Sequence, residues 1–194
     1  MRLPLAAVLT LIAAPAMANP FSELMAASDG RLCYRGVYDP AAHPGRQTRE
    51  VLLSFNTEDL WGGQSQVMRL AFRREGGAWY VWGGCGWADK DINRGVGGRI
   101  LQPEYTLEHG ISCHASAGLD EEGGDFPIEY RDDDHLVVYP GEGLAARSGF
   151  ADDLRSAYAE FSEADLVLPV ERVDLAQCAE LVKGLGEPIG YPPE

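Results

Sequence analysis

Hydrophobic and polar side chains alternate most regularly between residues 68 and 82. Residues 68–72 place apolar side chains on one face, a Gly76-Gly77 turn follows, and residues 79–82 resume the pattern with Trp, Tyr, Val and Trp. Alternation on both sides of a two-glycine turn is typical of a β-hairpin. The glycine-rich residues 83–86 are expected to end the second strand, and residues 111–113 to begin another.

Shorter apolar runs predict the remaining strands. They lie at residues 32–38, 50–55, 125–130, 135–139 and 166–170. The run at 50–55 is apolar on both faces and is expected to be buried on both. Residues 39–45, 56–64 and 86–98 show no clear period and are expected to be loops or turns. Pro169 favours an edge or a bulge for the last strand, because proline has no amide hydrogen to donate.

Three segments have helical character. Residues 20–27 predict a short helix or an ordered tail, and residues 150–161 carry apolar side chains at helical spacing. Asp174 is the expected N-cap of a helix over residues 175–183, with an inner face of Leu175, Cys178, Ala179 and Val182. About eight short strands with one or two short helices indicate a mainly β fold, namely a small antiparallel barrel or sandwich.

The first 18 residues have the pattern of a secretory signal peptide. Arg2 lies in a short basic head, an apolar run follows, and Ala16-Met17-Ala18 matches a cleavage site. The apolar run is shorter than the roughly 20 residues that cross a bilayer, and no later stretch reaches that length. We therefore expect a periplasmic or secreted protein with no transmembrane segment, in which residues 19–194 form a single β-rich domain.

Four cysteines follow the predicted cleavage site. An even set in an exported chain is expected to be oxidised. The sequence contains no Cys-x-x-Cys pair, which would favour zinc binding. Three pairings are open. We expect Cys85–Cys113, which closes a local loop beside two strands, and Cys33–Cys178, which would tie the first strand to the last helix. Each bridge contributes roughly 3–5 kcal/mol in the chain-entropy model.

The chain is strongly acidic, with a formal net charge of −14 at pH 7 and an isoelectric point near 4.6. Removing Arg2 with the signal peptide makes the mature chain one unit more negative. Such a charge repels nucleic-acid phosphates and anionic lipid headgroups. Nucleic acid is therefore not an expected partner, and a macromolecular partner would be a basic protein.

One pattern spans most of the mature chain. Cys33 is followed by Tyr38-Asp39, His43-Pro44 and Gln47 before an apolar strand, and Cys178 lies near the carboxyl end. In these positions the chain resembles a group of uncharacterised exported bacterial proteins. A Cys-Asp-Gly-Gly run is expected in that group where this chain has Cys113-His114-Ala115-Ser116. The resemblance implies export and assigns no activity.

Candidate ligand-binding residues are His43, Gln47, Trp82 and Trp87. The two tryptophans belong to an aromatic set with Trp79 and Tyr80 that could line a cleft. His43 lies in a proline-rich turn without an adjacent nucleophile, and the chain has no Gly-x-Ser-x-Gly motif. No catalytic residue is therefore assigned.

Metal and cofactor motifs are weak in this sequence. His109, Cys113 and His114 are close along the chain, but their side chains need not converge, and a disulfide explains the cysteine better. The acidic runs at 120–125 and 132–134 lack the ordered spacing of a calcium loop, and residues 95–98 lack the spacing of a phosphate loop. We expect no metal and no cofactor.

Small size, disulfides, negative charge and the missing catalytic motif favour an exported binding or inhibitor-like module. A small hydrolase that uses His43 or His114 with a nearby acid is an alternative from another class. A structural envelope component without a ligand is a third. A structure separates the first two, because a catalytic imidazole should face a concave pocket beside a carboxylate or hydroxyl.

Overall fold

The computed structural model describes residues 19–60, 63–88, 107, 109–118, 121–148 and 156–185. The expected signal peptide, residues 1–18, lies outside these ranges. The described part contains strands β1 Arg31–Val37, β2 Thr48–Leu60, β3 Gly63–Arg74, β4 Gly77–Ala88, β5 Gly110–Gly118, β6 Glu121–Asp132, β7 His135–Val138, β8 Gly143–Arg147, β9 Ser156–Glu160 and β10 Leu168–Arg172. Its helices are α1 Pro20–Ala27, α2 Ala179–Leu185 and the 3-10 turns η3 Glu163–Asp165 and η4 Leu175–Cys178.

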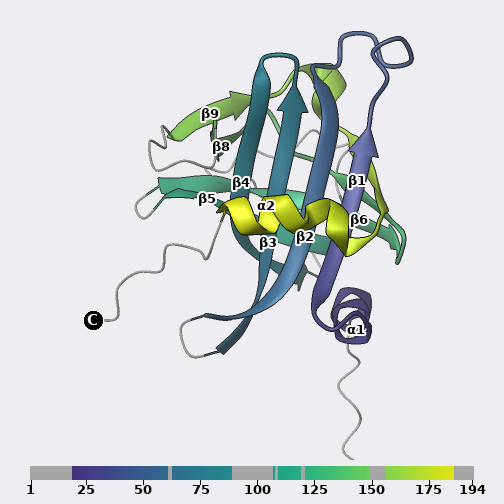
Figure 1. Ribbon diagram of the computed structural model, residues 1–194, viewed down its shortest axis with the longest axis vertical. Coiled ribbons are helices and arrows are strands. Elements are labelled where there is room, and N and C mark those ends of the chain that lie inside the picture. The colour runs from purple at the N-terminus through teal and green to yellow at the C-terminus, as the bar shows by residue number, and fades with distance from the viewer. Residues whose placement is uncertain are drawn as a thin grey trace, which may run out of the picture.

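Eight of these strands close an antiparallel barrel (Figure 1). Their order is β3-β2-β1-β10-β7-β6-β5-β4, and pairing between β3 and β4 completes the ring. The hairpin of β8 and β9 extends from β4 at Tyr80. The expected mainly β fold is confirmed, and of the two expected architectures it is the barrel that forms.

The barrel interior is a hydrophobic core. Alternate residues of each strand point inward, as Val51, Leu53 and Phe55 do on β2, and all three are fully buried. An eight-stranded barrel is just wide enough for side chains to fill it. The inward positions of this barrel carry large apolar residues in one contiguous cluster. Candidate sites must therefore be sought on the outside of the barrel.

Both ends of the barrel are covered. At one end α1, seen at the bottom of Figure 1, places Phe21 against Phe55 with ring centroids 5.0 Å apart. Asn19 caps this helix by accepting a hydrogen bond from the amide of Ser22. At the other end Phe161, which follows β9, lies 4.8 Å from the ring of Phe72.

The two expected disulfides are confirmed. Cys85 and Cys113 are directly opposite each other on β4 and β5. Cys33 on β1 joins Cys178 of η4, so the carboxyl-terminal helices are held on the outside of the barrel. Figure 1 shows α2 crossing the outer face of β2 and β3, where Leu181 packs against Leu52 and Ala71.

Several strand boundaries differ from the sequence expectation. Residues 56–60 and 63–64 continue β2 and β3 instead of forming a turn. Their side chains are mainly polar because this hairpin extends past the hydrophobic core. Residues 83–88 continue β4, and its glycines do not end it, because ladders with β3 and β5 hold both sides of the strand. The rest of the expected loop, from residue 89, lies outside the described residues.

The expected helix over 150–161 is wrong where the structure describes it. Residues 156–160 form β9, which pairs with β8, a strand that the sequence did not predict. Tyr158, which the helical pattern placed on a buried face, is 63% exposed, whereas Ala159 is buried. Of the buried apolar positions described in these two strands, only Leu144 is large, and the small Ala146 and Ala159 hid the alternation. Residues 149–155 lie outside the described ranges.

The last strand and helix need smaller corrections. β10 lies between β7 and β1 and is not an edge strand, although at Pro169 its ladder runs only to β7. Tyr38 uses that gap, because its hydroxyl donates to the Pro169 carbonyl at 2.8 Å. Asp174 caps η4 as expected. Because the first turn is a 3-10 helix, Leu175 and Ala179 are exposed, and Leu181 supplies the inner face with Cys178.

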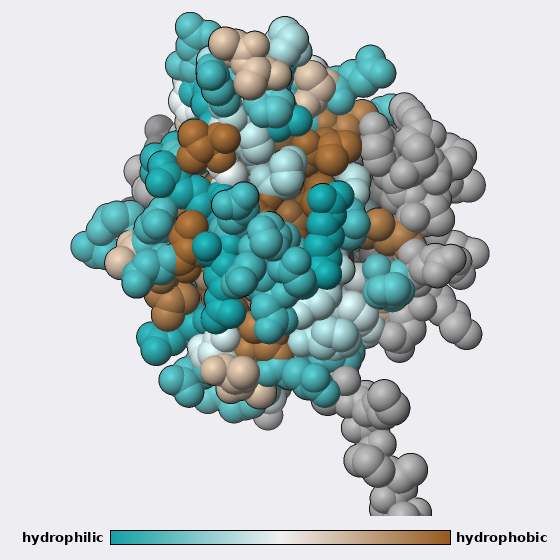
Figure 2. Space-filling view, turned by 90° about the vertical axis from the view of Figure 1, so that its right-hand side faces the viewer, coloured by the Kyte–Doolittle hydropathy of each residue, from teal (hydrophilic) through white to brown (hydrophobic). Residues whose placement is uncertain are grey.

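Within the described ranges, no helix has the length and apolar character needed to cross a bilayer. The face of the barrel on the side of β1 is mainly hydrophilic, with small hydrophobic patches scattered across it (Figure 2).

Candidate functional site

An open groove of about 550 Å³ lies on the outside of the barrel, across β3, β4 and β5. It is lined by Gln64, Ser65, Gln66, Val67, Trp82, Gly83, Gly84, Cys85, Gly86, Ser112 and His114. We call it the Trp82 groove. Three neighbouring strands build it, so its shape is fixed by ladder hydrogen bonds and by the Cys85–Cys113 disulfide.

Glycines form the floor of the Trp82 groove. Gly84 and Gly86 are exposed, and a methyl group added to either would meet no atom within 4 Å. Gly83, directly before Gly84, has the opposite role, because a methyl group there would overlap the backbone oxygen of His114. The Gly83-Gly84-Cys85-Gly86 run therefore brings β4 close to β5 and leaves bare backbone under the groove.

Trp82 forms one wall of the groove. It is half-buried and lies on the outer face of β4, opposite Arg69 of β3. Arg69 is itself buried, and two of its nitrogens bind the carboxylate oxygens of Glu58 at 2.5 and 3.2 Å. A bidentate ion pair holds a guanidinium in one orientation. The indole of Trp82 thus stands beside an immobilised side chain.

His114 and Asp125 form the opposite side. His114 is paired with Gly84 on one side and with Asp125 on the other, and its Nδ1 lies 2.7 Å from Asp125 Oδ1. The carboxylate orients the ring, so Nε2 is the nitrogen that remains for a ligand. Ser112 lines the same groove, but no hydrogen bond joins it to His114 in the described structure. The hydroxyl is therefore not positioned as a nucleophile.

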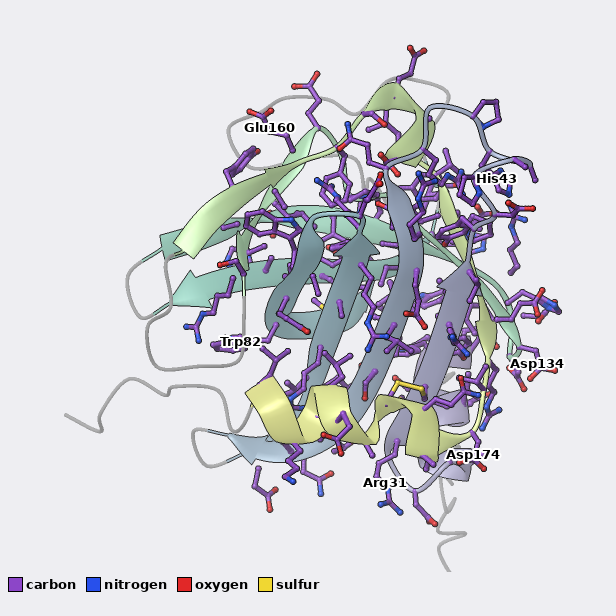
Figure 3. The ribbon with its side chains drawn as sticks, turned by 45° about the horizontal axis from the view of Figure 1, so that its top comes forward. Arg31, His43, Trp82, Asp134, Glu160 and Asp174 are labelled. Atoms are coloured by element: carbon purple, nitrogen blue, oxygen red, sulfur yellow. A yellow bond between two sulfur atoms is a disulfide. The ribbon has the colours of Figure 1, made fainter. Side chains whose placement is uncertain are left out.

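The structure does not bring the four candidate ligand-binding residues together. Trp82 lies in the groove, whereas Trp87 packs partly buried against the core, with its ring 5.9 Å from Tyr130. Gln47 lines a different cleft at one end of the barrel. His43 is in the loop between β1 and β2, well away from Trp82, as Figure 3 shows.

The remaining polar residues of the groove were missed as candidates. Gln64 fell in the expected turn region, Gln66 lay between that region and the expected hairpin, and Ser112 gave no motif. His114 was singled out only as an alternative, and Asp125 only as part of an acidic run. The signal that could have joined them is the strand register that sets Cys85 opposite Cys113, because it also sets Gly84 opposite His114.

No group of three or more metal-ligating side chains occurs in the part of the chain that the structure describes. The acidic turn between β6 and β7 has internal partners instead. Asp132 accepts a hydrogen bond from His135 at 2.7 Å, which raises the pKa of the imidazole and lowers that of the carboxyl. Tyr130 donates to Asp133.

No protein-family model, no curated protein and no solved structure matches this chain. The geometry of the Trp82 groove is therefore the basis for a function.

Proposed function

We propose that this protein is an exported binding module that holds a neutral, hydroxyl-rich ligand, a saccharide, in the Trp82 groove. One observation carries the proposal: the half-buried Trp82 borders a bare glycine floor whose polar neighbours are mainly amides and hydroxyls. A sugar ring has an apolar C–H face that stacks on an aromatic ring, and hydroxyls at its edge that both donate and accept hydrogen bonds. The groove offers both kinds of contact.

The polar groups suit a neutral ligand. Gln64 and Gln66 each provide a carbonyl acceptor and an amide donor, and Ser65 and Ser112 provide hydroxyls. Among the described residues no lysine or arginine lines the groove, and the His114 imidazole is already held by Asp125. An anionic ligand would therefore find no guanidinium or ammonium partner among the described lining residues.

Export and charge fit the same proposal. The signal-peptide pattern in residues 1–18 and two disulfides support a location outside the cytoplasm. The net charge of −14 adds long-range attraction for a basic partner, such as a protein that carries the glycan. The groove, however, supplies the specific contacts.

Calorimetric titration with neutral oligosaccharides of glucose, xylose and N-acetylglucosamine tests the proposal. We expect saturable binding of at least one probe, with a Kd at or below about 1 mM. Trp82→Ala should weaken it at least about tenfold, equivalent to about 1.4 kcal/mol. Gly84→Leu should do the same, because a Cβ at this position meets no atom of the fold and the added side chain projects into the groove.

Gly63→Leu is the matched control. Gly63 is also an exposed strand glycine with open space around it, but it does not line the groove. The Gly63→Leu protein should bind the saccharide probe with the same affinity as the wild type. If no probe binds saturably, or if the folded Gly84→Leu protein binds as well as the control, the saccharide proposal is wrong.

The His114–Asp125 pair favours a second candidate, a hydrolase in which His114 acts as a general base. His43 is a weaker candidate, because its ring lies edge-on to Tyr38 at 6.0 Å and has no carboxylate partner in the described structure. Chromogenic glycosides and esters separate the two functions. A hydrolase should turn one of them over, and His114→Ala should abolish turnover while Trp82 still supports binding. A wild-type protein without turnover excludes this candidate for those substrates.

A further inference from the structure

A second cleft, of about 580 Å³, lies at the end of the barrel that carries the β1–β2 loop, where Figure 3 labels His43. It is lined by Gly45, Arg46, Gln47, Arg49, Arg74, Glu75, Gly76 and Trp79. We call it the arginine cleft. The loop before β2, the first residues of β2 and the β3–β4 turn each contribute to it. Three guanidinium groups therefore meet in one cleft of a chain whose net charge is −14.

These arginines differ from others on the barrel. Arg35 and Arg73 both bind Glu50, while Arg69 and Arg131 bind Glu58 and Glu129, respectively. In contrast, Arg46, Arg49 and Arg74 have no carboxylate within 4.0 Å among the described residues. An acidic chain has many carboxylates available to neutralise a guanidinium. Three arginines without a carboxylate partner among the described residues of one cleft thus indicate a place for an external anion.

Two of the three are held by the protein backbone. Arg46 donates from Nε to the Ala164 carbonyl and from Nη2 to the Val167 carbonyl, each at 3.0 Å, and its guanidinium lies 4.4 Å from the centre of the Tyr38 ring. Arg49 donates from Nη1 to the Arg46 carbonyl at 3.0 Å. Anchored guanidinium groups lose little side-chain entropy when an anion binds.

Arg74 has its recognition edge unused. Its guanidinium lies 4.7 Å from the centre of the Phe161 ring, and its Nε and Nη2 are buried without a hydrogen-bond partner. These two nitrogens form the side of a guanidinium that binds two oxygens of one anion in parallel. Arg46 Nη1 is also buried and unpartnered. Burial lowers the pKa of Arg74, opposed by nearby Asp165.

We propose that the arginine cleft binds the oxoanion of a small organic ligand, either a carboxylate or a phosphate. On binding, the side chain of Arg74 turns so that its Nε–Nη2 edge, which is buried without the ligand, meets two oxygens of the anion, and Arg46 and Arg49 add positive charge. Trp79 lines the same cleft and offers an aromatic surface for the body of the ligand.

Two acidic groups oppose the anion without filling its place. Glu75 lines the cleft but is exposed. Asp165 is fully buried, and its carboxylate accepts hydrogen bonds from the amides of Gln47 and Thr48 and from the Ser162 hydroxyl. Three guanidinium groups against two carboxylates leave the cleft positive.

This site is separate from the Trp82 groove, because the two clefts share no residue. It therefore adds a second ligand class to the proposed saccharide site, and each can fail without the other.

Calorimetric titration of the mature protein with inorganic phosphate and with benzoate tests the inference. We expect saturable binding of at least one, and the preferred probe tells which oxoanion the site takes. Arg74→Lys keeps the charge but loses the two-nitrogen edge, and should weaken binding at least about tenfold. Arg73→Met is the matched control, since Arg73 is exposed and pairs with Glu50, and its affinity should stay unchanged.

Circular dichroism establishes that each variant is folded. If Arg74→Lys does not fold, Arg49→Met replaces it. Arg49 makes a single described side-chain hydrogen bond to the protein, to the Arg46 carbonyl, so its loss should disturb the fold little. Arg49→Met should weaken binding at least about threefold. Absence of saturable binding to both probes overturns the inference. So does an equal loss in Arg73→Met, which would indicate nonspecific attraction to positive charge.

Discussion

Neighbouring glycines on β4 have opposite consequences for substitution. A methyl group on Gly83 overlaps the His114 carbonyl, which belongs to a paired strand and cannot move independently. We expect Gly83→Ala to lower the free energy of unfolding by about 2 kcal/mol or more. Gly84→Ala enters open space and should change it by less than about 0.5 kcal/mol. Urea unfolding of both variants measures this difference, and equal effects would contradict the close approach of β4 and β5.

Residue identity alone could not distinguish these two glycines. The run from Gly83 to Gly86 has the composition of a turn, and that composition predicted the end of the strand there. The distinction comes from which face each glycine occupies and how near the next strand lies, and neither is local information. For the same reason Trp82 was predicted as a ligand contact, whereas its partners Gln64, Gln66 and Ser112 were not.

At the scale of elements, one buried carboxylate ties the short η3 turn to the start of β2. Asp165 accepts amide hydrogen bonds at 2.9 and 3.1 Å from Thr48 and Gln47. Burial acts to raise the pKa of this carboxyl, but hydrogen bonds from Ser162, Thr48 and Gln47 outweigh it, so the pKa falls below the usual 3.8. A lowered pKa means that the contribution to stability is present above pH 3.8 and is lost as the pH falls through the folded-state value.

Asp165→Asn should therefore lower the free energy of unfolding by about 2 kcal/mol at pH 7, because an amide cannot accept all these hydrogen bonds. The difference from the wild type should shrink as the pH drops below about 4. Glu163→Gln is the control, since Glu163 is exposed in the same turn, and it should change stability by less than about 0.5 kcal/mol. Chemical unfolding at several pH values measures both. A difference that stays constant with pH would show that Asp165 does not titrate as described.

The elements that the sequence predicted well are strands with large apolar side chains on the face toward the core and polar side chains on the other face. The hairpin of β3 and β4 and the pair β6 and β7 were recognised because large apolar residues alternate with polar ones. The hairpin of β8 and β9 was missed because Leu144 is the only large residue among its described buried apolar positions, and Ala146 and Ala159 contribute little contrast. Apolar residues at 150, 154, 158 and 161 instead mimicked a helical period.

At the scale of the molecule, both candidate sites depend on long-range closure. The arginine cleft needs the β1–β2 loop beside the β3–β4 turn, and that proximity follows from the pairing of Thr48 with Arg74. No local motif marks it, so the sequence singled out only Gln47 there and, as part of an aromatic set, Trp79. The disulfides were predictable because an exported chain with four cysteines allows few pairings, and strand and helix assignments favoured one of them.

The Cys33–Cys178 bridge spans 145 residues and fastens the end of the chain to the first strand. Replacing both cysteines with alanine should lower the free energy of unfolding by about 5 kcal/mol in the chain-entropy model. Replacing Cys85 and Cys113, 28 residues apart, should cost about 3.5 kcal/mol. Only the first pair of changes should release α2 from Leu52 and Ala71, and amide hydrogen exchange will detect that as lost protection over residues 179–185. If α2 stays equally protected in both variants, packing of Leu181 holds the helix on the barrel without the bridge.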